Sequence, residues 1–253
     1  MSNVVGRPAV VGKQARAEQT RTAIIDAALA LFSERGFDAT TMRAIAEQAG
    51  VSLGSAYYYF DSKEQLIQGF YDQTAVVFGR ELPGHLDGVT AFGERLGIHL
   101  DLWFRLMAPH HPFAVAFFRN AADPASPLSP FSAESGPTRE AAIEMMRQVI
   151  DGSDLKVSKV VRAELPELLW LFHMGLVLFW VYDHSEGSAA TRLLAKRTVP
   201  LVQRAIELSR LPVLRTTIHD LVGLVGELKT LMAGDPAGDP AGDAGGDPAG
   251  PVG

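Results

Sequence analysis

The chain has 253 residues, of which 47% are apolar and 21% charged, and its formal net charge is −6. This length allows one large domain or two moderate ones, and the acidic balance excludes a protein coated with basic residues for bulk binding of nucleic acid, so that any DNA contact has to be local. Because cysteine is absent, disulfides, thiolate metal sites and cysteine nucleophiles are excluded as well.

The two ends of the chain predict no packed structure. Residues 1–19 scatter glycine, proline and basic residues without the apolar segment of a secretory signal, which predicts a flexible arm on a cytoplasmic protein. The Gly6-Arg7-Pro8 run leaves open a contact of this arm with a DNA minor groove. Residues 234–253 repeat Gly-Asp-Pro-Ala-Gly and predict a disordered acidic tail.

Between these ends the apolar residues recur with helical spacing, and no alternating strand pattern persists, so we expect an all-α fold. The first helix carries a stripe that includes Ile24 and Phe32 and should end at Gly36, a residue that tolerates the left-handed conformation. Further helical pattern follows Gly36, and the Leu82-Pro83-Gly84 run is expected to break it.

Three hydroxyl residues mark the starts of the next helices. Thr41 can cap a short second helix that ends at Gly50, and Ser52 can cap a third that runs to Phe60. Ser62 with Gln65 three positions later forms a capping box that opens a fourth helix. Later helices are expected at 90–107, 112–122, 137–151, 165–183, 189–209 and 212–232, with a long loop over 123–136 and a kink at Pro200.

The segment 40–63 reads TTMRAIAEQAGVSLGSAYYYFDSK. Two short helices joined at Gly50, with the small Ala46 and Ala56 where they must cross and Val51 at the corner, have the composition of a helix-turn-helix. Ordinary helical hairpins also place small residues at such a crossing. From these residues alone, DNA binding and simple packing are equally good interpretations.

This segment resembles the N-terminal DNA-binding head of the TetR family of transcriptional regulators. The resemblance covers about residues 21–71 and rests on the threonine-started helix, the Ile-Ala pair, Ala-Gly-Val-Ser, the tyrosines before Phe60, and Lys63 at the start of the fourth helix. It implies a three-helix head over 20–72, a larger helical ligand-binding and dimerisation domain over 73–233, and a homodimer that binds double-stranded operator DNA. Family members often have histidine where this chain has Tyr59.

The resemblance also implies roles for residues of the head. Thr41, Arg43, Tyr58 and Lys63 should contact phosphates, and the recognition helix should face the major groove with Ser52, Leu53, Gly54, Ser55 and Tyr57. Tyr57 could instead be a half-buried packing residue. Because these positions hold no arginine or glutamine that could bind a base through two hydrogen bonds, DNA shape or water should supply part of the specificity.

The second domain should hold the dimer interface and a pocket. The run 168–182 is apolar on nearly all sides but shorter than the roughly 20 residues that cross a bilayer, so we expect it to pack with 189–209 against a partner subunit, or else within one subunit, and not in a membrane. For an unknown small apolar effector the candidate residues are His99, Trp103, Phe117, Asn120 and His173, although aromatic residues at helical spacing are more often core than pocket.

Other classes of function find little support in the sequence. No nucleophile with a base, paired carboxylates, phosphate-binding glycine loop or metal-ligand spacing is visible, so we expect no catalytic residues, no cofactor and no metal. The resemblance implies a repressor, which is the family's common mode. The remaining alternative to a regulator is a helical protein-interaction module without sequence-specific DNA binding.

Overall fold

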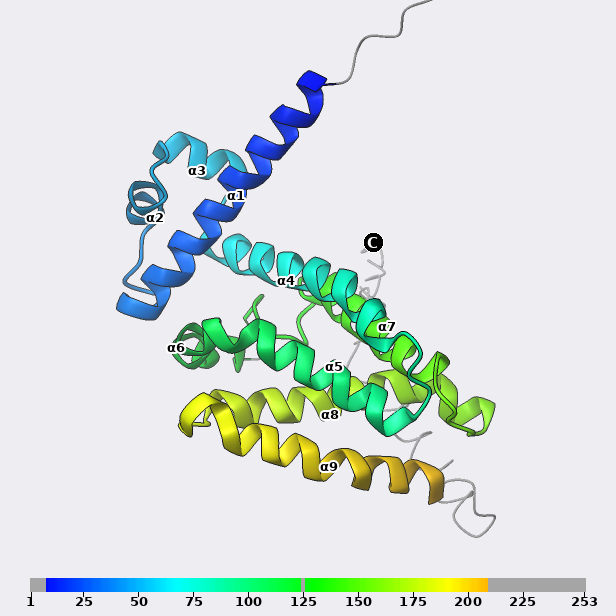
Figure 1. The fold of residues 1–253 in the computed structure, drawn as a ribbon. Helices are drawn as coiled ribbons and strands as arrows, with labels where there is room; N and C mark the ends of the chain where they lie inside the picture. Colours follow the sequence, from blue (N-terminus) through cyan, green and yellow to red (C-terminus); the bar gives the residue numbers. More distant parts are fainter. Residues whose placement is uncertain (1–7, 124–125, 209–253) are drawn as a thin grey trace, which may run out of the picture.

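The computed structural model describes residues 8–123 and 126–208, and every regular element in these residues is a helix. The all-α expectation is therefore confirmed. Figure 1 shows α1, α2 and α3 gathered at one end of the molecule, with α4 leading from this end into a body formed by the later helices. The expected helix 212–232 and the expected tail 234–253 lie outside the described residues.

The first helix is longer than the sequence predicted. α1 spans Pro8–Arg35, so residues 8–19, expected as a flexible arm, are helical. Alanine, glutamine, arginine and glutamate dominate residues 14–19 and favour a helix, which the buried second half, including Ile24 and Phe32, anchors in the core. Proline is tolerated at a first helical turn, which fits Pro8 at the start. The helix ends before Gly36, whose φ of +83° requires a residue without a side chain.

The next helices pack around α1. α2 is Met42–Gln48, α3 is Leu53–Tyr59 and α4 is Lys63–Leu86. α4 continues through Pro83, where a break had been expected, and the proposed division between residues 72 and 73 falls inside it. A proline three residues before the end of a helix removes only one hydrogen bond, and the burial of Leu82 and Leu86 offsets that loss.

The body consists of α5 (Phe92–Met107), α6 (His111–Ala121), α7 (Gly136–Asp151), α8 (Lys159–Val181) and α9 (Ala189–Leu208), with a 3-10 turn at Ala108–His110 before α6. These bounds lie within two residues of the predicted ones except for α8. That helix begins six residues early because the Ser158 hydroxyl caps it, accepting a hydrogen bond from the Val161 N–H at 3.3 Å. Both α8 and α9 continue through an internal proline.

Asp183 fixes the junction between α8 and α9. Its carboxylate accepts hydrogen bonds from the backbone N–H and hydroxyl of Ser185, at 2.9 and 2.6 Å, and from those of Thr191, at 2.8 and 2.6 Å. Burial alone would raise the pKa of Asp183, but these four bonds outweigh it and hold the pKa well below its ordinary value. The ionised carboxylate therefore orients α9 against α8.

Candidate DNA-binding face and ligand cavity

The α2–α3 pair forms a helix-turn-helix with a fully packed inner side. Ile45, Ala46 and Ala56 are buried at the crossing, and the small alanines allow the two helices to approach closely. The Val51 N–H donates to the Ala46 carbonyl at 2.9 Å, and Gly50 takes a φ of +67° at the corner. The turn is thus held by its own backbone, and the outer side of α3 is left free for another molecule.

Hydroxyl caps define where both helices start, as the sequence predicted. Thr41 accepts a hydrogen bond from the Ala44 N–H at 3.2 Å, and Ser52 accepts one from the Ser55 N–H at 3.0 Å. Thr41, Ser52 and the neighbouring Arg43 are all exposed. These side chains are therefore accessible at the start of each helix.

The outer side of α3 is polar and aromatic. Gly54, Tyr57 and Tyr58 share one side of the helix, because residues three and four positions apart are neighbours on a helix surface. Tyr57 is 47% exposed and Tyr58 82%, whereas Ala56 on the opposite side is buried. Both tyrosine side chains are therefore accessible to another molecule on the outer side of α3. The alternative interpretation of Tyr57 as a half-buried packing residue accounts for the covered half of its side chain but not for the exposed half.

Leu53 and Ser55 lie at the edge of this face. Both are partly buried, and Leu53 packs against the core. Tyr59 is also partly buried, with its ring perpendicular to that of Tyr58 at a centroid separation of 5.2 Å. Tyr59 thus supports the orientation of Tyr58 from the inner side.

Lys63 has a partner inside the protein. Its ammonium donates a 2.6 Å hydrogen bond to the Phe37 carbonyl and lies 4.4 Å from the centre of the Phe37 ring. The Asp38 carbonyl is a weaker acceptor at 3.5 Å. Lys63 therefore ties the start of α4 to the loop after α1, an internal role that the sequence did not indicate.

A cavity of about 910 Å³ lies within the body, between α4, α5, α6, α7 and α8. Four of the five predicted ligand residues line it: His99, Trp103, Phe117 and His173. The fifth, Asn120, belongs to α6, but its side chain lies outside the described part of the chain. All three tryptophans of the sequence are in the wall, since Trp170 and Trp180 join Trp103 there.

Several wall residues were missed by sequence reasoning. Tyr71 and Phe78 of α4 face the cavity, and burial raises the pKa of the Tyr71 hydroxyl far above its ordinary value. Trp170, His173 and Trp180 recur at helical spacing along α8, a pattern that could have indicated one shared side. Conversely, Phe92 and Phe104 are core residues that lie outside the wall.

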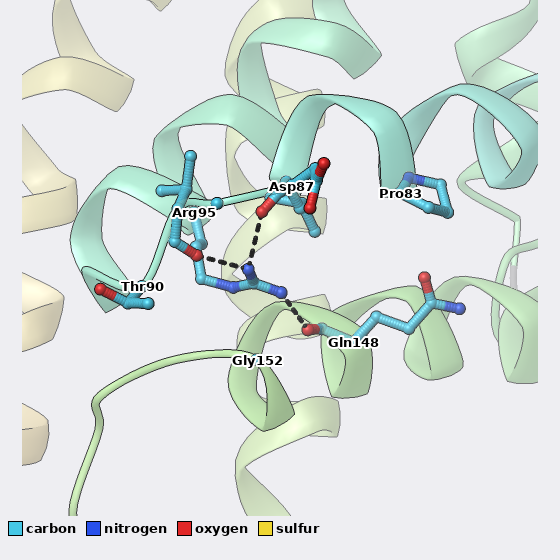
Figure 2. A pocket seen from close by; sticks show the side chains of 9 residues that line it. Pro83, Asp87, Thr90, Arg95, Gln148 and Gly152 are labelled. Atoms are coloured by element: carbon cyan, nitrogen blue, oxygen red, sulfur yellow. Dashed lines mark hydrogen bonds between the residues drawn. The ribbon is translucent and has the colours of Figure 1, made fainter.

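A second, smaller cavity of about 350 Å³ lies where the ends of α4 and α7 meet, and it contains Arg95 (Figure 2). The buried guanidinium donates to four backbone carbonyls, those of Leu86 at 3.1 Å, Val89 at 2.7 Å, Gln148 at 2.7 Å and Val149 at 2.8 Å. Four of its five N–H donors are thereby used. This arrangement is a structural clamp on two helix C-termini, where a cation is favoured.

Comparison with known proteins places both halves of the chain. Residues 24–69 match the family model described as bacterial regulatory proteins, tetR family, and residues 95–224 match the one described as tetracyclin repressor-like, C-terminal domain. Together these matches cover the helix-turn-helix, and most of the body that holds the cavity.

Individual relatives agree with these matches. The HTH-type transcriptional repressor KstR2 of Rhodococcus jostii (strain RHA1) is 47% identical over 64 residues, which are 24% of this chain and 30% of KstR2. The first curated relatives are matched over only 28% to 46% of their own length.

Solved structures share the fold over much more of the chain. A TetR transcriptional regulator from Nitrosomonas europaea has a TM-score of 0.56 and 21% identity, covering 72% of this chain and 97% of that one. FadR from Bacillus subtilis, solved in complex with stearoyl-CoA, has a TM-score of 0.56 and 19% identity, covering 70% and 96%.

Proposed function

Since the chain belongs to the TetR family of bacterial regulatory proteins, we propose that it is a homodimeric transcriptional repressor in the cytoplasm, which binds a near-palindromic operator and is released by a small apolar molecule. The observation that carries the proposal is the joining of two sites by one helix. α4 begins at the helix-turn-helix and its middle forms part of the cavity wall.

For the DNA contact we assign α3 to the major groove. Its outer residues Gly54, Ser55 and Tyr57 face the base edges, and the exposed Tyr58 hydroxyl and Arg43 contact phosphates on either side. In a two-fold dimer the second head then reads the next half-site, about one helical turn or a multiple of it away.

The charge of the head sets the expected strength of this contact. Residues 1–70 contain seven acidic residues and seven basic ones, the latter being Arg7, Lys13, Arg16, Arg21, Arg35, Arg43 and Lys63. Only four of these basic residues, Arg21, Arg35, Arg43 and Lys63, belong to the head over residues 20–72, so the head has no net positive charge with which to bind DNA without regard to sequence. If Arg43 and Lys63 neutralise phosphates in both heads, the log–log salt slope of the affinity is about −3.6.

The dimer contact is assigned to α8 and α9. By length and composition α8 is the one described helix that could cross a membrane, and 44% of its apolar window is buried. Phe179 near its end and Tyr182 just after it are 43% and 62% exposed, and the partly exposed Leu171 and Leu178 also line the cavity. α9 adds the exposed Leu193, Leu201 and Leu208. A partner subunit would cover this apolar surface, which is unfavourable in water.

Release by a ligand follows from what α4 touches. The Gln68 side chain donates to the Pro127 carbonyl and the Ser135 hydroxyl, both at 3.1 Å, and the Thr138 hydroxyl donates to Asp72 at 3.1 Å. Ser135 and Thr138 also line the cavity. A ligand that shifts this wall therefore shifts α4 and the attached head, and it favours the spacing of heads to which it binds better.

The test measures how substitution of each of two exposed arginines changes binding to an operator, which is first obtained by selecting bound duplexes from a random DNA pool. Arg43→Ala should weaken operator binding and reduce the salt slope by about 2 per dimer, since one phosphate contact is lost in each head. Arg80→Ala, an exposed position of α4 away from the head, is the matched control and should change neither. Equal effects of the two substitutions, measured by fluorescence anisotropy over a range of salt, would overturn the assignment.

A further inference from the structure

Two histidines from different helices meet in the wall of the large cavity. His99 of α5 and His173 of α8 lie with ring centroids 5.4 Å apart and planes at 85°. Phe78 stands 4.9 Å from the His99 ring and Trp103 stands 4.8 Å from the His173 ring, both edge to face. Their surroundings are thus aromatic and apolar.

The nitrogens of this pair lack the partners that buried polar atoms normally have. His99 is 2% exposed and His173 6%. Among the described residues, nothing forms a hydrogen bond with either ring nitrogen of His99 or with Nε2 of His173. An unsatisfied buried polar atom costs free energy, and a phenylalanine at either place would pack as an aromatic ring without that cost. The arrangement therefore indicates a partner that arrives from outside.

Both imidazoles are neutral at physiological pH. Burial, and secondarily the neighbouring His173, holds the pKa of His99 well below its ordinary value, and burial lowers the pKa of His173 to about 4. A neutral imidazole offers one N–H donor and one lone pair. The complementary group is an oxygen that can donate, accept or do both, which describes a hydroxyl or a carbonyl.

The remaining wall gives no pairing charge beside the histidines. Arg139 is the one charged residue among the described lining residues, and its Nη1 donates to the carbonyls of Pro130 and Ser132 at 2.9 and 3.2 Å, at the start of α7. An ionised group next to His99 and His173 would lose its hydration without a compensating ion pair. An uncharged group suits this part of the cavity.

We infer that the effector is an uncharged, predominantly aromatic or polycyclic molecule whose hydroxyl or carbonyl oxygen hydrogen-bonds to His99 and His173. This inference rests on the proposed function, because it assumes that the cavity binds the effector. The nitrogens are covered by their neighbours in the present structure. Binding of the ligand oxygen therefore requires that the side chains around the two rings uncover these nitrogens.

The test uses three probes of equal framework with the full-length protein. 4-Phenylphenol carries a neutral hydroxyl, 4-methylbiphenyl replaces it by a methyl group, and 4-biphenylcarboxylate replaces it by a charge. Because all three tryptophans line the cavity, their fluorescence reports binding directly. We expect 4-phenylphenol to bind at least tenfold more tightly than either of the other two.

Variants assign this preference to the histidines. His99→Phe and His173→Phe should each reduce the hydroxyl preference at least threefold while still binding 4-methylbiphenyl, which shows that the cavity is intact. His85→Phe, at an exposed histidine of α4, is the matched control and should keep the preference. If either cavity variant fails to fold, the wild-type comparison remains decisive.

Probe binding tests the inference about the effector, and DNA binding tests the proposed function. Equal affinity of the wild type for 4-phenylphenol and 4-methylbiphenyl, tightest binding of the carboxylate, or no binding of any probe overturns the inference. A preference that survives in both variants overturns it too. None of these results touches sequence-specific DNA binding, which is measured separately on the operator and whose absence would overturn the proposed function instead.

Discussion

Replacing Arg95 by methionine should destabilise the protein more than any exposed substitution. Methionine fills the volume of the aliphatic part of the side chain but removes four hydrogen bonds to carbonyls at the end of α4, in the loop after it and at the end of α7, of which Figure 2 shows the one to Gln148. The Leu86 and Gln148 carbonyls keep a second partner in backbone N–H groups, so about two acceptors become unsatisfied. At about 1–3 kcal/mol for each, with the loss of a charged donor, we expect a cost of about 3–5 kcal/mol.

The assay is urea unfolding followed by tryptophan fluorescence, at one fixed protein concentration because a dimer's stability depends on it. A loss of this size is a large part of the total stability of about 5–15 kcal/mol, and it should lower the midpoint by roughly 1–2 M. Arg80→Met, on the exposed surface of α4, is the control and should change the stability by less than about 0.5 kcal/mol. An equal midpoint for both variants would refute the clamp.

Gly152 provides an independent check on the same clamp. A side chain at Gly152 would collide with the Arg95 guanidinium, although its φ of −83° suits any residue. Replacement of a glycine by alanine at such a φ normally stabilises a protein. Because of the collision, Gly152→Ala should instead destabilise the wild type. In the Arg95→Met background the penalty should shrink, and a double-mutant cycle with no coupling would contradict the contact.

Four further substitutions test the head and the junction of α8 and α9. Tyr58→Phe should weaken binding to all DNA sequences alike, whereas Ser55→Ala should change the preference among sites; competition with operator variants distinguishes them, and a uniform loss for both would contradict these roles. Lys63→Met should lower the stability of the head by about 1–2 kcal/mol in addition to weakening DNA binding, which hydrogen exchange in the loop after α1 would detect. Asp183→Asn should destabilise the protein at neutral pH. Since folding depresses this pKa, the stabilisation is complete above the unfolded value of about 3.9 and is lost as pH falls through the folded one, so a difference from wild type that grows below pH 4 would refute it.

Capping residues and glycines made the helices of the DNA-binding head predictable from the sequence. Thr41, Ser52 and Ser62 cap α2, α3 and α4, and Gly36 and Gly50 take positive φ angles just after α1 and α2 end. In the box at Ser62, the Gln65 side chain accepts from the Asp61 N–H at 2.9 Å, one residue before the expected donor. Such signals act within a few residues, so one sequence contains them in full.

Features that depend on tertiary contacts escaped prediction. Pro83 lies inside α4, where a break had been expected, because burial of Leu82 and Leu86 offsets the lost hydrogen bond, and no local pattern states how strong that burial is. The Arg95 clamp joins carbonyls more than fifty residues apart. The internal bond of Lys63 is likewise a contact between distant segments, and its phosphate role stays a prediction.

The cavity shows the same division. Aromatic residues on α5 and α6 indicated its position, and four of the five candidate side chains do line it. The spacing of apolar residues could not show that α4 forms part of the cavity wall. The sequence pattern of its inward side is the same whether that side faces the core or a cavity. The link between the two sites through Gln68 and Asp72 became visible only in three dimensions.

The most direct test of the central claim is selection of bound duplexes from a random DNA pool by the purified full-length protein, followed by affinity measurements at two salt concentrations. We predict enrichment of a near-palindromic sequence, bound by a dimer with an affinity that falls as salt rises. No enriched sequence, together with DNA binding that is absent or independent of salt, would contradict it and favour a helical protein-interaction module.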